Sequence, residues 1–538
     1  MRICAISLPE LRIELVRARV GQEPLSGPFA VVVAPEPMTE AKLLGNTRLS
    51  VVSREARAHG IAPGQTIAQA RARAANLAVR VVRPEAVRDV LARIAEVGLA
   101  FGATVSFGMA GEGENDFGDV VWIDVTGCAH LHDPRGGRGI FDGETVLASR
   151  LAGVIAALGH TCAIAIADGP RVAAMLAKTS AEVAARAAMS KPQKLLLLEP
   201  IVVRPGENAT AIAPLPIGVL PVSAADVRWL TKLGIRSIAD FRGLPRDGVG
   251  ARLGAAARDV LTLADGEDRA PLRAYVPPEV PAEDAELEYG VEGSQALTFV
   301  AKTLTDRLAA RLQGRAMAAA RIELELRLDA AMLRDHPTEN AIATITLDLP
   351  APLASAGDLL AALRPKLERL VLAAPVLRAS LRAPSLVHKR AAVLALFEPQ
   401  PKASHTLPRL VAELVSDLGA SAVARLELGD SWVPEDRSRL VAFDAKHATK
   451  KRKRRLLSTI PEPTRLLPAP LPVGRDGVHV TRHLARVEAL EWWKEAPTAN
   501  ARARAPLDYV QAWIEDGGAA WVAIDRATGA MTIRGWFD

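Results

Sequence analysis

The sequence predicts a multidomain α/β protein, and three observations carry this prediction. The chain has 538 residues, whereas a single hydrophobic core stops growing at about 250 to 300 residues. Apolar residues make up 49% of the sequence, which is enough to build several cores. Through residues 1–190, β-forming runs alternate with helical patterns, which is typical of a sheet covered by helices.

The densest β-forming run is residues 117–131, FGDVVWIDVTGCAHL. Val120, Val121, Ile123 and Val125 favour a buried, pleated surface, and a glycine lies near each end of the run. We expect it to form the central strand. The other expected strands lie at residues 4–8, 29–34, 49–53, 79–82 and 161–167, and the expected helices at 10–19, 84–101 and 145–158, with a helix-turn-helix after residue 53.

Composition indicates no zinc site, disulfide framework or membrane segment, and it leaves binding to a polyanion possible. The net charge of +6 permits binding to a polyanion without requiring it. Cys4, Cys128 and Cys162 are the three cysteines, and their spacing indicates neither a zinc site nor a disulfide framework. The chain begins without a signal-peptide pattern and has no apolar run of about 18 residues. We therefore expect a soluble, cytoplasmic protein without a membrane segment.

The central run resembles the palm signature of the Y-family translesion DNA polymerases, S-I-D-E-x-Y-L-D-V-T, when Asp124 is laid on its last Asp. Asp119 then falls on the first Asp of the signature, and Val120 falls on its Glu. One metal-binding carboxylate of the family is kept and the other is lost. Taken alone, the run is equally compatible with an ordinary core strand preceded by an acidic turn.

The N-terminus departs further from the family, which has a D-x-D pattern after its first strand. Ser7 and Pro9 occupy the two acidic positions. Nucleotidyl transfer needs carboxylates there, because two Mg²⁺ ions must be held between the protein and the phosphates. The resemblance therefore implies a polymerase fold without catalysis, metal or cofactor. The rival interpretation is an active translesion polymerase that uses Asp119 and Asp124 with Glu10 or Glu14.

Residues 53–70 resemble the fingers of the family, S-Y-E-A-R-x-x-G-V-x-x-G-M-x-x-x-x-A. Arg57 keeps the arginine that contacts the incoming triphosphate in the family, whereas Arg54 replaces the tyrosine. Arg171 is the cation nearest to the position of the family's phosphate-binding lysine. The resemblance implies a vestigial nucleotide site at Arg57 and Arg171, and the alternative for Arg57 is a solvated helix arginine.

The next two segments resemble the thumb and the little finger. The residues Pro221-Val222-Ser223 replace the glycine-rich turn of the thumb's helix-hairpin-helix, and Ser223 with Asp226 is a candidate helix cap. We expect a weakened grip on DNA. The little finger is expected to contain helices at 295–311 and 359–372 and strands at 320–328 and 340–347, with positive charge toward DNA from Arg307, Arg311, Arg315 and Arg321.

Two short segments after the predicted little finger are candidates for binding the sliding clamp and DNA. Val393, Leu394, Leu396 and Phe397 resemble the Q-L-x-L-F peptide that docks in the bacterial sliding clamp, with Val393 in place of Gln. A buried edge strand is the alternative. A run of six cations cannot pack in a core and is expected to attract DNA phosphate, although it could act only in solubility. These cations are Lys450, Lys451, Arg452, Lys453, Arg454 and Arg455.

The landmarks of the whole chain resemble the ImuB branch of the Y-family, which keeps the architecture without the acidic site. The resemblance implies a non-enzymatic adapter in damage-induced mutagenesis that joins the sliding clamp, a RecA-like accessory protein of the ImuA type, an error-prone C-family DNA polymerase and DNA. A plain DNA-binding protein is a third interpretation. The expected domains are the palm (1–10 and 79–190), fingers (11–78), thumb (191–282), little finger (283–388), a clamp-peptide region (389–445), a basic linker (446–475) and a tryptophan-rich β module (476–538).

Overall fold

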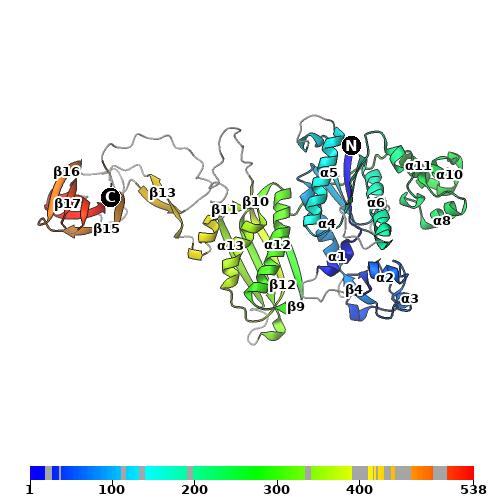
Figure 1. The fold of residues 1–538 in the computed structure, drawn as a ribbon, viewed down its shortest axis with the longest axis horizontal. Helices are drawn as coiled ribbons and strands as arrows, with labels where there is room; N and C mark the ends of the chain where they lie inside the picture. The colour runs from blue at the N-terminus through cyan, green and yellow to red at the C-terminus, as the bar shows by residue number, and fades with distance from the viewer. Residues whose placement is uncertain are drawn as a thin grey trace. The chain divides into compact units, whose positions relative to one another are not determined.

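The computed structural model divides into two compact units, Met1–Ser416 and Asp417–Asp538, which are described separately (Figure 1). Both units contain β-sheets. The structure describes the chain except for residues 19–26, 36–37, 111–116, 133–139, 191–197, 334–340, 390–409, 416, 420–421, 429–437, 443–460, 462, 489–505, 516 and 538.

A five-stranded sheet, which we call the central sheet, forms the core of the first unit. Its strand order is β5-β6-β1-β7-β8, and β1 pairs antiparallel with both of its neighbours. All six residues of β1 are buried, because helices cover both faces of the sheet. The strands are β1 (Arg2–Ser7), β5 (Thr104–Gly108), β6 (Val120–Asp124), β7 (Ala163–Asp168) and β8 (Ile201–Val202).

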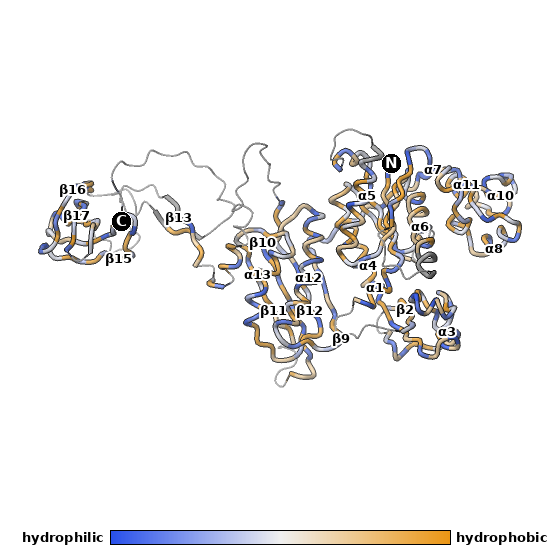
Figure 2. Tube along the Cα trace, in the orientation of Figure 1, coloured by the Kyte–Doolittle hydropathy of each residue, from blue (hydrophilic) through white to orange (hydrophobic). Residues whose placement is uncertain are grey.

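Alternate residues of β1 contact different helices. Cys4 and Ile6 pack in a core shared with α4 (Pro84–Gly98) and α5 (Ile140–Ala157). Ile3 and Ala5 pack on the other face, against α6 (Pro170–Ser190). The helices lie on either side of the strands in Figure 1, and Figure 2 shows the strands as a mainly apolar layer. The predicted α/β fold is confirmed.

Two details of the central sheet differ from the sequence prediction. The central strand is shorter than residues 117–131, because Gly127 has a φ of +75° and the chain turns there. A short 3-10 helix, Ala129–Leu131, follows. Strand β5 was not predicted. It pairs with β6, and the backbone approaches so closely at Gly102 that a Cβ would lie 2.2 Å from the carbonyl oxygen of Asp124.

A separate three-stranded sheet has the order β3-β2-β4. Strand β4 pairs parallel with β2 along its whole length, from Phe29–Ala78 to Val33–Val82. This corrects the boundary predicted at residue 78, because β4 belongs to the sheet of the fingers segment and not to the central sheet. The elements of this part are α1 (Leu11–Arg17), β2 (Phe29–Val33), β3 (Val51–Val52), α2 (Arg54–Ala58), α3 (Ile67–Arg71) and β4 (Ala78–Val82).

A helical segment follows the central sheet, at the position predicted for the thumb. Its apolar residues, including Leu230 and Phe241, join the core that also contains the α6 face of the central sheet. The helices are α7 (Asn208–Ile212), α8 (Ala224–Lys232), α9 (Ile238–Arg242), α10 (Arg246–Leu253) and α11 (Ala257–Ala264).

The next module is a four-stranded sheet of order β11-β10-β12-β9 with two helices. Its core contains the inward-facing residues of β10 and β12 together with those of α12 and α13, as expected for a small α/β module. Strands β9 and β12 were not predicted. The elements are β9 (Ala282–Val291), α12 (Ser294–Gly314), β10 (Met317–Leu328), β11 (Ile342–Leu353), α13 (Ala356–Glu368) and β12 (Val376–His388).

The second unit contains a two-stranded hairpin and a five-stranded antiparallel sheet of order β15-β19-β18-β17-β16. The predicted β module therefore exists, but its first strand lies in the segment assigned to the linker. Tyr509 and Trp521 stack with ring centroids 4.9 Å apart and are both buried. The strands are β13 (Ala424–Leu428), β14 (Ser438–Ala442), β15 (Arg465–Val473), β16 (Val478–Val487), β17 (Leu507–Ile514), β18 (Gly518–Asp525) and β19 (Met531–Trp536).

Candidate active site of the central sheet

The residues that sequence analysis laid on the acidic positions of the polymerases lie together at one end of the central sheet. Ser7 of β1 pairs in register with Val120 of β6. The backbone N–H of Leu8 donates to the carbonyl oxygen of Asp119 over 2.9 Å. Ser7 and Asp119 are both buried, with exposed fractions of 5% and 8%. Two segments more than a hundred positions apart thus form one site.

The Asp119 carboxylate is held by a guanidinium. Arg12 Nε donates to Oδ2 over 3.0 Å, and Arg12 Nη2 donates to Oδ1 over 3.1 Å, so the pair is bidentate. The backbone N–H of Ala110 also donates to Oδ1, over 2.9 Å, and the Ala110 carbonyl accepts from Arg12 Nη2. Both side chains are buried. Charge-assisted bidentate hydrogen bonds of this kind are stronger than hydrogen bonds between neutral groups.

Arg12 was not identified from the sequence, although a signal was present. Arg12 and Val16 are spaced by four residues in the predicted helix, which places Arg12 on the same helix face as an apolar residue. Val16 is buried. An arginine on such a face needs an acidic partner, because a buried charge is costly unless it is paired. Asp119 was the carboxylate that the sequence analysis placed in the same site as Ser7, which lies shortly before Arg12 in the sequence.

Asp124 and Glu14, which the rival interpretation assigns to an active polymerase, do not contact Asp119. Asp124 lies at the opposite end of β6, about 16 Å away at 3.3 Å per residue, and its Oδ1 accepts from the N–H and hydroxyl of Thr126. Glu14 accepts from the backbone N–H of Thr161 over 2.8 Å, and its other oxygen lies 2.9 Å from His160 Nδ1. Both carboxylates therefore have partners of their own.

Glu10 is the remaining candidate acid. Its Oε1 lies 3.8 Å from Arg57 Nη2. Burial raises the pKa of Glu10 above its ordinary value, and the nearby Arg57 and Arg17 only partly offset this effect. Within the described part of the chain, no three His, Cys, Asp or Glu side chains are grouped so that they could hold a metal ion.

The two predicted nucleotide-binding arginines are in different environments. Arg57 of α2 is about one quarter exposed beside Glu10. Arg171 at the start of α6 donates from Nε to Asp268 Oδ1 over 2.9 Å and from Nη1 to Asp259 Oδ2 over 2.6 Å. Arg171 therefore ties α6 to the helical segment, and its donors point at carboxylates.

The predicted hairpin turn of the thumb precedes α8. The Ser223 hydroxyl accepts from the backbone N–H of Asp226 over 3.1 Å and donates to Asp226 Oδ2 over 2.6 Å. Ser223 thus caps the helix as expected. The cap also places the Asp226 carboxylate at the N-terminal turn of α8, where Arg252 pairs with it over 2.9 Å.

The little-finger arginines do not form the exposed basic face that we expected. Arg311 and Arg315 point into an ion-pair network with Glu96 of α4, and Arg311 also contacts Glu283. Arg321 is paired with Asp348 over 2.6 Å. Burial lowers the pKa of Arg307 to about 10. Three of these arginines form ion pairs with carboxylates of the protein, and the fourth, Arg307, is largely buried. Their charges are therefore not displayed toward DNA as we expected.

The outer face of the four-stranded sheet is also electrically balanced. Arg382 pairs with Glu325 over 2.7 Å, and Arg378 pairs with Asp284 over 3.3 Å. Together with the Arg321–Asp348 pair, these contacts join neighbouring strands of the sheet. Cross-strand ion pairs stabilise a sheet modestly, and they leave little net charge on this face to attract phosphate.

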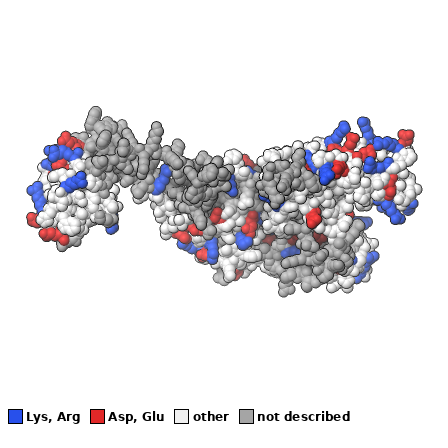
Figure 3. Space-filling view, turned by 45° about the horizontal axis from the view of Figure 1, so that its top comes forward, with Lys and Arg blue, Asp and Glu red and all other residues white. Residues whose placement is uncertain are grey.

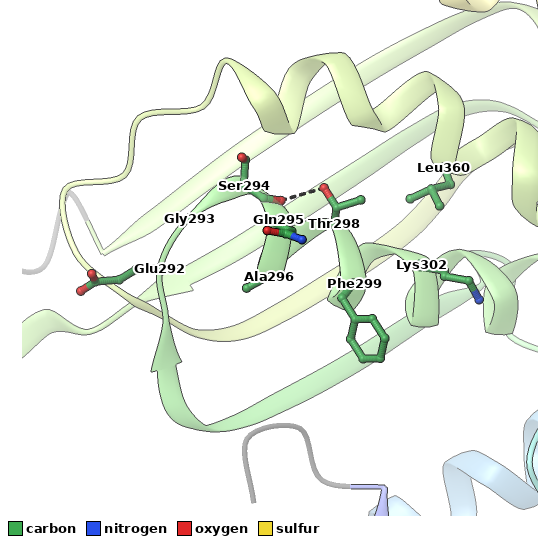
Figure 4. Close-up of a pocket in the computed structure, with 9 residues that line it drawn as sticks. All are labelled: Glu292, Gly293, Ser294, Gln295, Ala296, Thr298, Phe299, Lys302 and Leu360. Atoms are coloured by element: carbon green, nitrogen blue, oxygen red, sulfur yellow. Dashed lines mark hydrogen bonds between the residues drawn. The ribbon is translucent and has the colours of Figure 1, made fainter.

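An open groove of about 780 Å³ lies at the start of α12 (Figure 4). Phe299 and Lys302 of α12 and Leu360 of α13 line it, and Thr298 donates its hydroxyl hydrogen to the Ser294 carbonyl over 2.7 Å. Phe299 is 63% exposed. The groove holds no cluster of catalytic side chains, so it is not a candidate active site.

Two predicted sites lie outside the described residues. These are the clamp peptide with Val393, Leu394, Leu396 and Phe397, and the basic run from Lys450 to Arg455. They remain predictions from sequence. In the described residues, no helix has the length and apolar character needed to cross a bilayer.

Comparisons with known proteins agree with the resemblance. Residues 22–178 match the impB/mucB/samB family. Over 379 residues the chain is 27% identical to Protein ImuB of Caulobacter vibrioides, from strain NA1000 / CB15N and from strain ATCC 19089 / CIP 103742 / CB 15, with 70% of this chain and 73% of each relative covered.

Among solved structures, DinB from Sulfolobus solfataricus is similar over 71% of this chain and 98% of that chain, with 15% identity and a TM-score of 0.39. The insertion ternary complex of Dbh DNA polymerase gives the same identity, coverage and TM-score.

Proposed function

We propose that this chain, which is 27% identical to Protein ImuB of Caulobacter vibrioides and matches the impB/mucB/samB family over residues 22–178, is a non-catalytic adapter in damage-induced mutagenesis and translesion synthesis. It links the sliding clamp, a RecA-like accessory protein and an error-prone C-family DNA polymerase on damaged DNA in the cytoplasm. The observation that carries the proposal is the bidentate pair between Arg12 and Asp119.

The ion pair between Arg12 and Asp119 supports loss of catalysis, because a metal ion at Asp119 would have to displace the Arg12 guanidinium. A Mg²⁺ ion at Asp119 needs carboxylate oxygens and keeps near-octahedral geometry. Both Asp119 oxygens already accept hydrogen bonds from Arg12, and one also accepts from Ala110. Displacing Arg12 would leave a buried guanidinium without its partner, which costs several kcal/mol. With Ser7 opposite, no second carboxylate of the family pattern offsets this cost.

The rival function, an active polymerase with a non-standard acidic site, requires Asp119, Asp124 and Glu10 or Glu14 to share a pair of metals. Metals in two-metal sites lie about 3.5 to 4 Å apart. Asp124 is at the far end of β6, and Glu14 bonds Thr161. The geometry therefore favours the adapter.

An adapter acts by raising the local concentration of a working polymerase at the primer end, so it must hold two partners at once. The polar contacts with DNA are assigned to the basic run Lys450 to Arg455, and the clamp contact to Val393, Leu394, Leu396 and Phe397. Arg57 is the better of the two candidates for a vestigial nucleotide contact, because Arg171 is engaged by Asp259 and Asp268.

Two assays on the full chain test the proposal. In the first, the protein is given a primed template with Mg²⁺ or Mn²⁺, beside an active Y-family polymerase as control. We expect no extension, and template-dependent incorporation that disappears in Asp119→Ala would overturn the loss of catalysis. In the second, beads carrying the sliding clamp are mixed with a C-family polymerase. The polymerase should be retained only when this chain is added, and retention that is independent of the chain would reject the adapter role.

A further inference from the structure

Helix α8 of the first unit exposes an apolar pair that the fold does not use. Trp229 is 40% exposed and Leu233, at the C-terminal cap, is 59% exposed. They are spaced by four residues, so they lie on one face of the helix. The helix buries only Leu230. The fold therefore requires neither Trp229 nor Leu233 to be apolar.

Cations surround this apolar pair. Arg228, Lys232 and Arg236 are exposed and form no ion pair within the described residues. The Arg252 guanidinium lies 4.9 Å from the centroid of the Trp229 ring, where a cation–π contact holds the ring in place. Arg252 also pairs with Asp226 over 2.9 Å. Basic side chains are visible over this segment in Figure 3, interspersed with acidic ones.

We propose that this face of α8 docks an acidic protein segment that carries an apolar anchor. Tryptophan and arginine are the residue types that dominate binding energy at protein interfaces. Arg228 and Lys232, together with Arg236, whose charge the nearby Asp240 partly offsets, define the sign of the partner. The inference goes beyond the proposed function, because it names a contact other than the clamp peptide and the basic run.

One observation favours an acidic protein segment over DNA as the occupant. Leu233 offers apolar surface that a phosphate backbone cannot cover, whereas a leucine or phenylalanine of a partner can.

The test is a selection of peptides that bind the purified full chain. A phage-displayed library of random 12-residue peptides is first depleted on the Trp229→Ser/Leu233→Ser variant and then selected on the wild-type chain. We expect the enriched peptides to be net negative and to contain an aromatic or aliphatic residue. Failure to enrich peptides, or enrichment of basic or uncharged ones, would overturn the proposal.

A labelled peptide from this selection then separates the contributions by fluorescence anisotropy. The double variant, and separately Arg228→Gln/Lys232→Gln/Arg236→Gln, should each weaken binding about tenfold or more. Phe299→Ser is the matched control, since it removes another exposed aromatic residue, and it should leave binding unchanged. Melting curves of all variants should agree with that of the wild type, because none of the changed side chains is buried.

Competition with a 20-nucleotide single strand and with a duplex identifies the class of partner. If either DNA displaces the peptide and itself binds less tightly to the double variant, the face binds nucleic acid and the proposal is wrong. These outcomes are separate from the bead assay for the adapter, which reports the clamp and the polymerase only.

Discussion

Arg311 Nη1 of α12 lies 2.6 Å from Glu96 Oε1 of α4, although 215 positions separate the two residues in the sequence. Arg311 Nε also contacts Glu283, which in turn accepts two bonds from Arg93 of α4. Arg315 bonds the second oxygen of Glu96. All of these side chains are at least nine-tenths buried. Buried ion pairs therefore join helix α12 to helix α4, which packs on the central sheet.

Glu96→Gln should destabilise the first unit strongly. The substitution keeps the shape of the side chain but leaves Arg311 and Arg315 without their shared anion, and breaking a buried ion pair from one side costs about 3 to 5 kcal/mol. The free energy of unfolding in urea measures the effect. Asp348→Asn, which breaks the exposed pair with Arg321, is the control and should cause no resolvable change. Equal stability of wild type and Glu96→Gln would show that the network does not stabilise the fold.

Glu283 should make stability depend on pH in the acid range. Burial alone would raise the pKa of Glu283, but Arg93 and Arg311 outweigh burial and hold the pKa below its ordinary value of 4.5. A carboxylate with a lowered pKa contributes stability above its unfolded pKa and loses it as the pH falls through the folded pKa.

Melting temperatures measured between pH 7 and pH 3 test this dependence. The wild type should lose stability below about pH 4.5, and Glu283→Gln should show a flatter profile at a lower starting value. Glu292→Gln, at an exposed position, is the control and should follow the wild type. A Glu283→Gln profile parallel to that of the wild type would assign the acid loss to other carboxylates.

The resemblance predicted which residues of two β-forming runs belong to the candidate site. Ser7 and Val120 were laid on acidic positions of the polymerase patterns, and the structure pairs them in register. Side chains in a strand alternate between faces, so few registers bury both runs. The end of β6 at Asp124 was not predicted, although Gly127 was noted near the end of the run, because the apolar pattern does not show where the turn with a positive φ begins.

Contacts between distant charged residues could not be predicted in the same way. Arg93 and Glu283 are 190 positions apart, and Arg171 is 97 positions from Asp268. Nothing in the sequence near an exposed-looking helix arginine tells whether its partner is water, DNA or a carboxylate from another domain. The arginines of the predicted little finger were assigned to DNA for that reason. In the structure, Arg311 and Arg315 instead form ion pairs with Glu96 of α4.

Arg12→Leu should destabilise the chain more than the double substitution Arg12→Leu/Asp119→Leu. Among the described residues, the single change leaves the buried carboxylate of Asp119 with the Ala110 N–H as its remaining donor, which costs about 3 to 5 kcal/mol, whereas replacing both charges by apolar groups is often close to neutral. A thermodynamic cycle of the two single variants and the double variant in urea measures the coupling. Additive effects of the single changes would contradict the pairing.

The basic run should contribute DNA affinity that depends on salt and not on sequence. Replacing Lys450 to Arg455 by glutamine removes six charges, so binding to a duplex should weaken and the slope of log K against log salt should become shallower. Fluorescence anisotropy between 50 and 200 mM salt, on the order of the range where such binding changes most, measures both quantities. Reversing the order of the six residues keeps the charge and should leave the affinity unchanged. If the glutamine variant binds as tightly as the wild type, the run serves solubility alone.

The clamp peptide should act through its three apolar anchors. A groove binder concentrates its energy in a few side chains, each costing about 1 to 2 kcal/mol or more on truncation, so Leu394→Ala/Leu396→Ala/Phe397→Ala should abolish capture by the sliding clamp. If these residues instead complete a sheet, the same changes would lower the melting temperature, which circular dichroism measures. Leu410→Ala/Leu414→Ala/Leu418→Ala removes three exposed leucines nearby and is the matched control. Capture that survives the first triple substitution would move the search for the clamp contact to the C-terminal module, because the energy of docking would then reside in side chains outside this peptide.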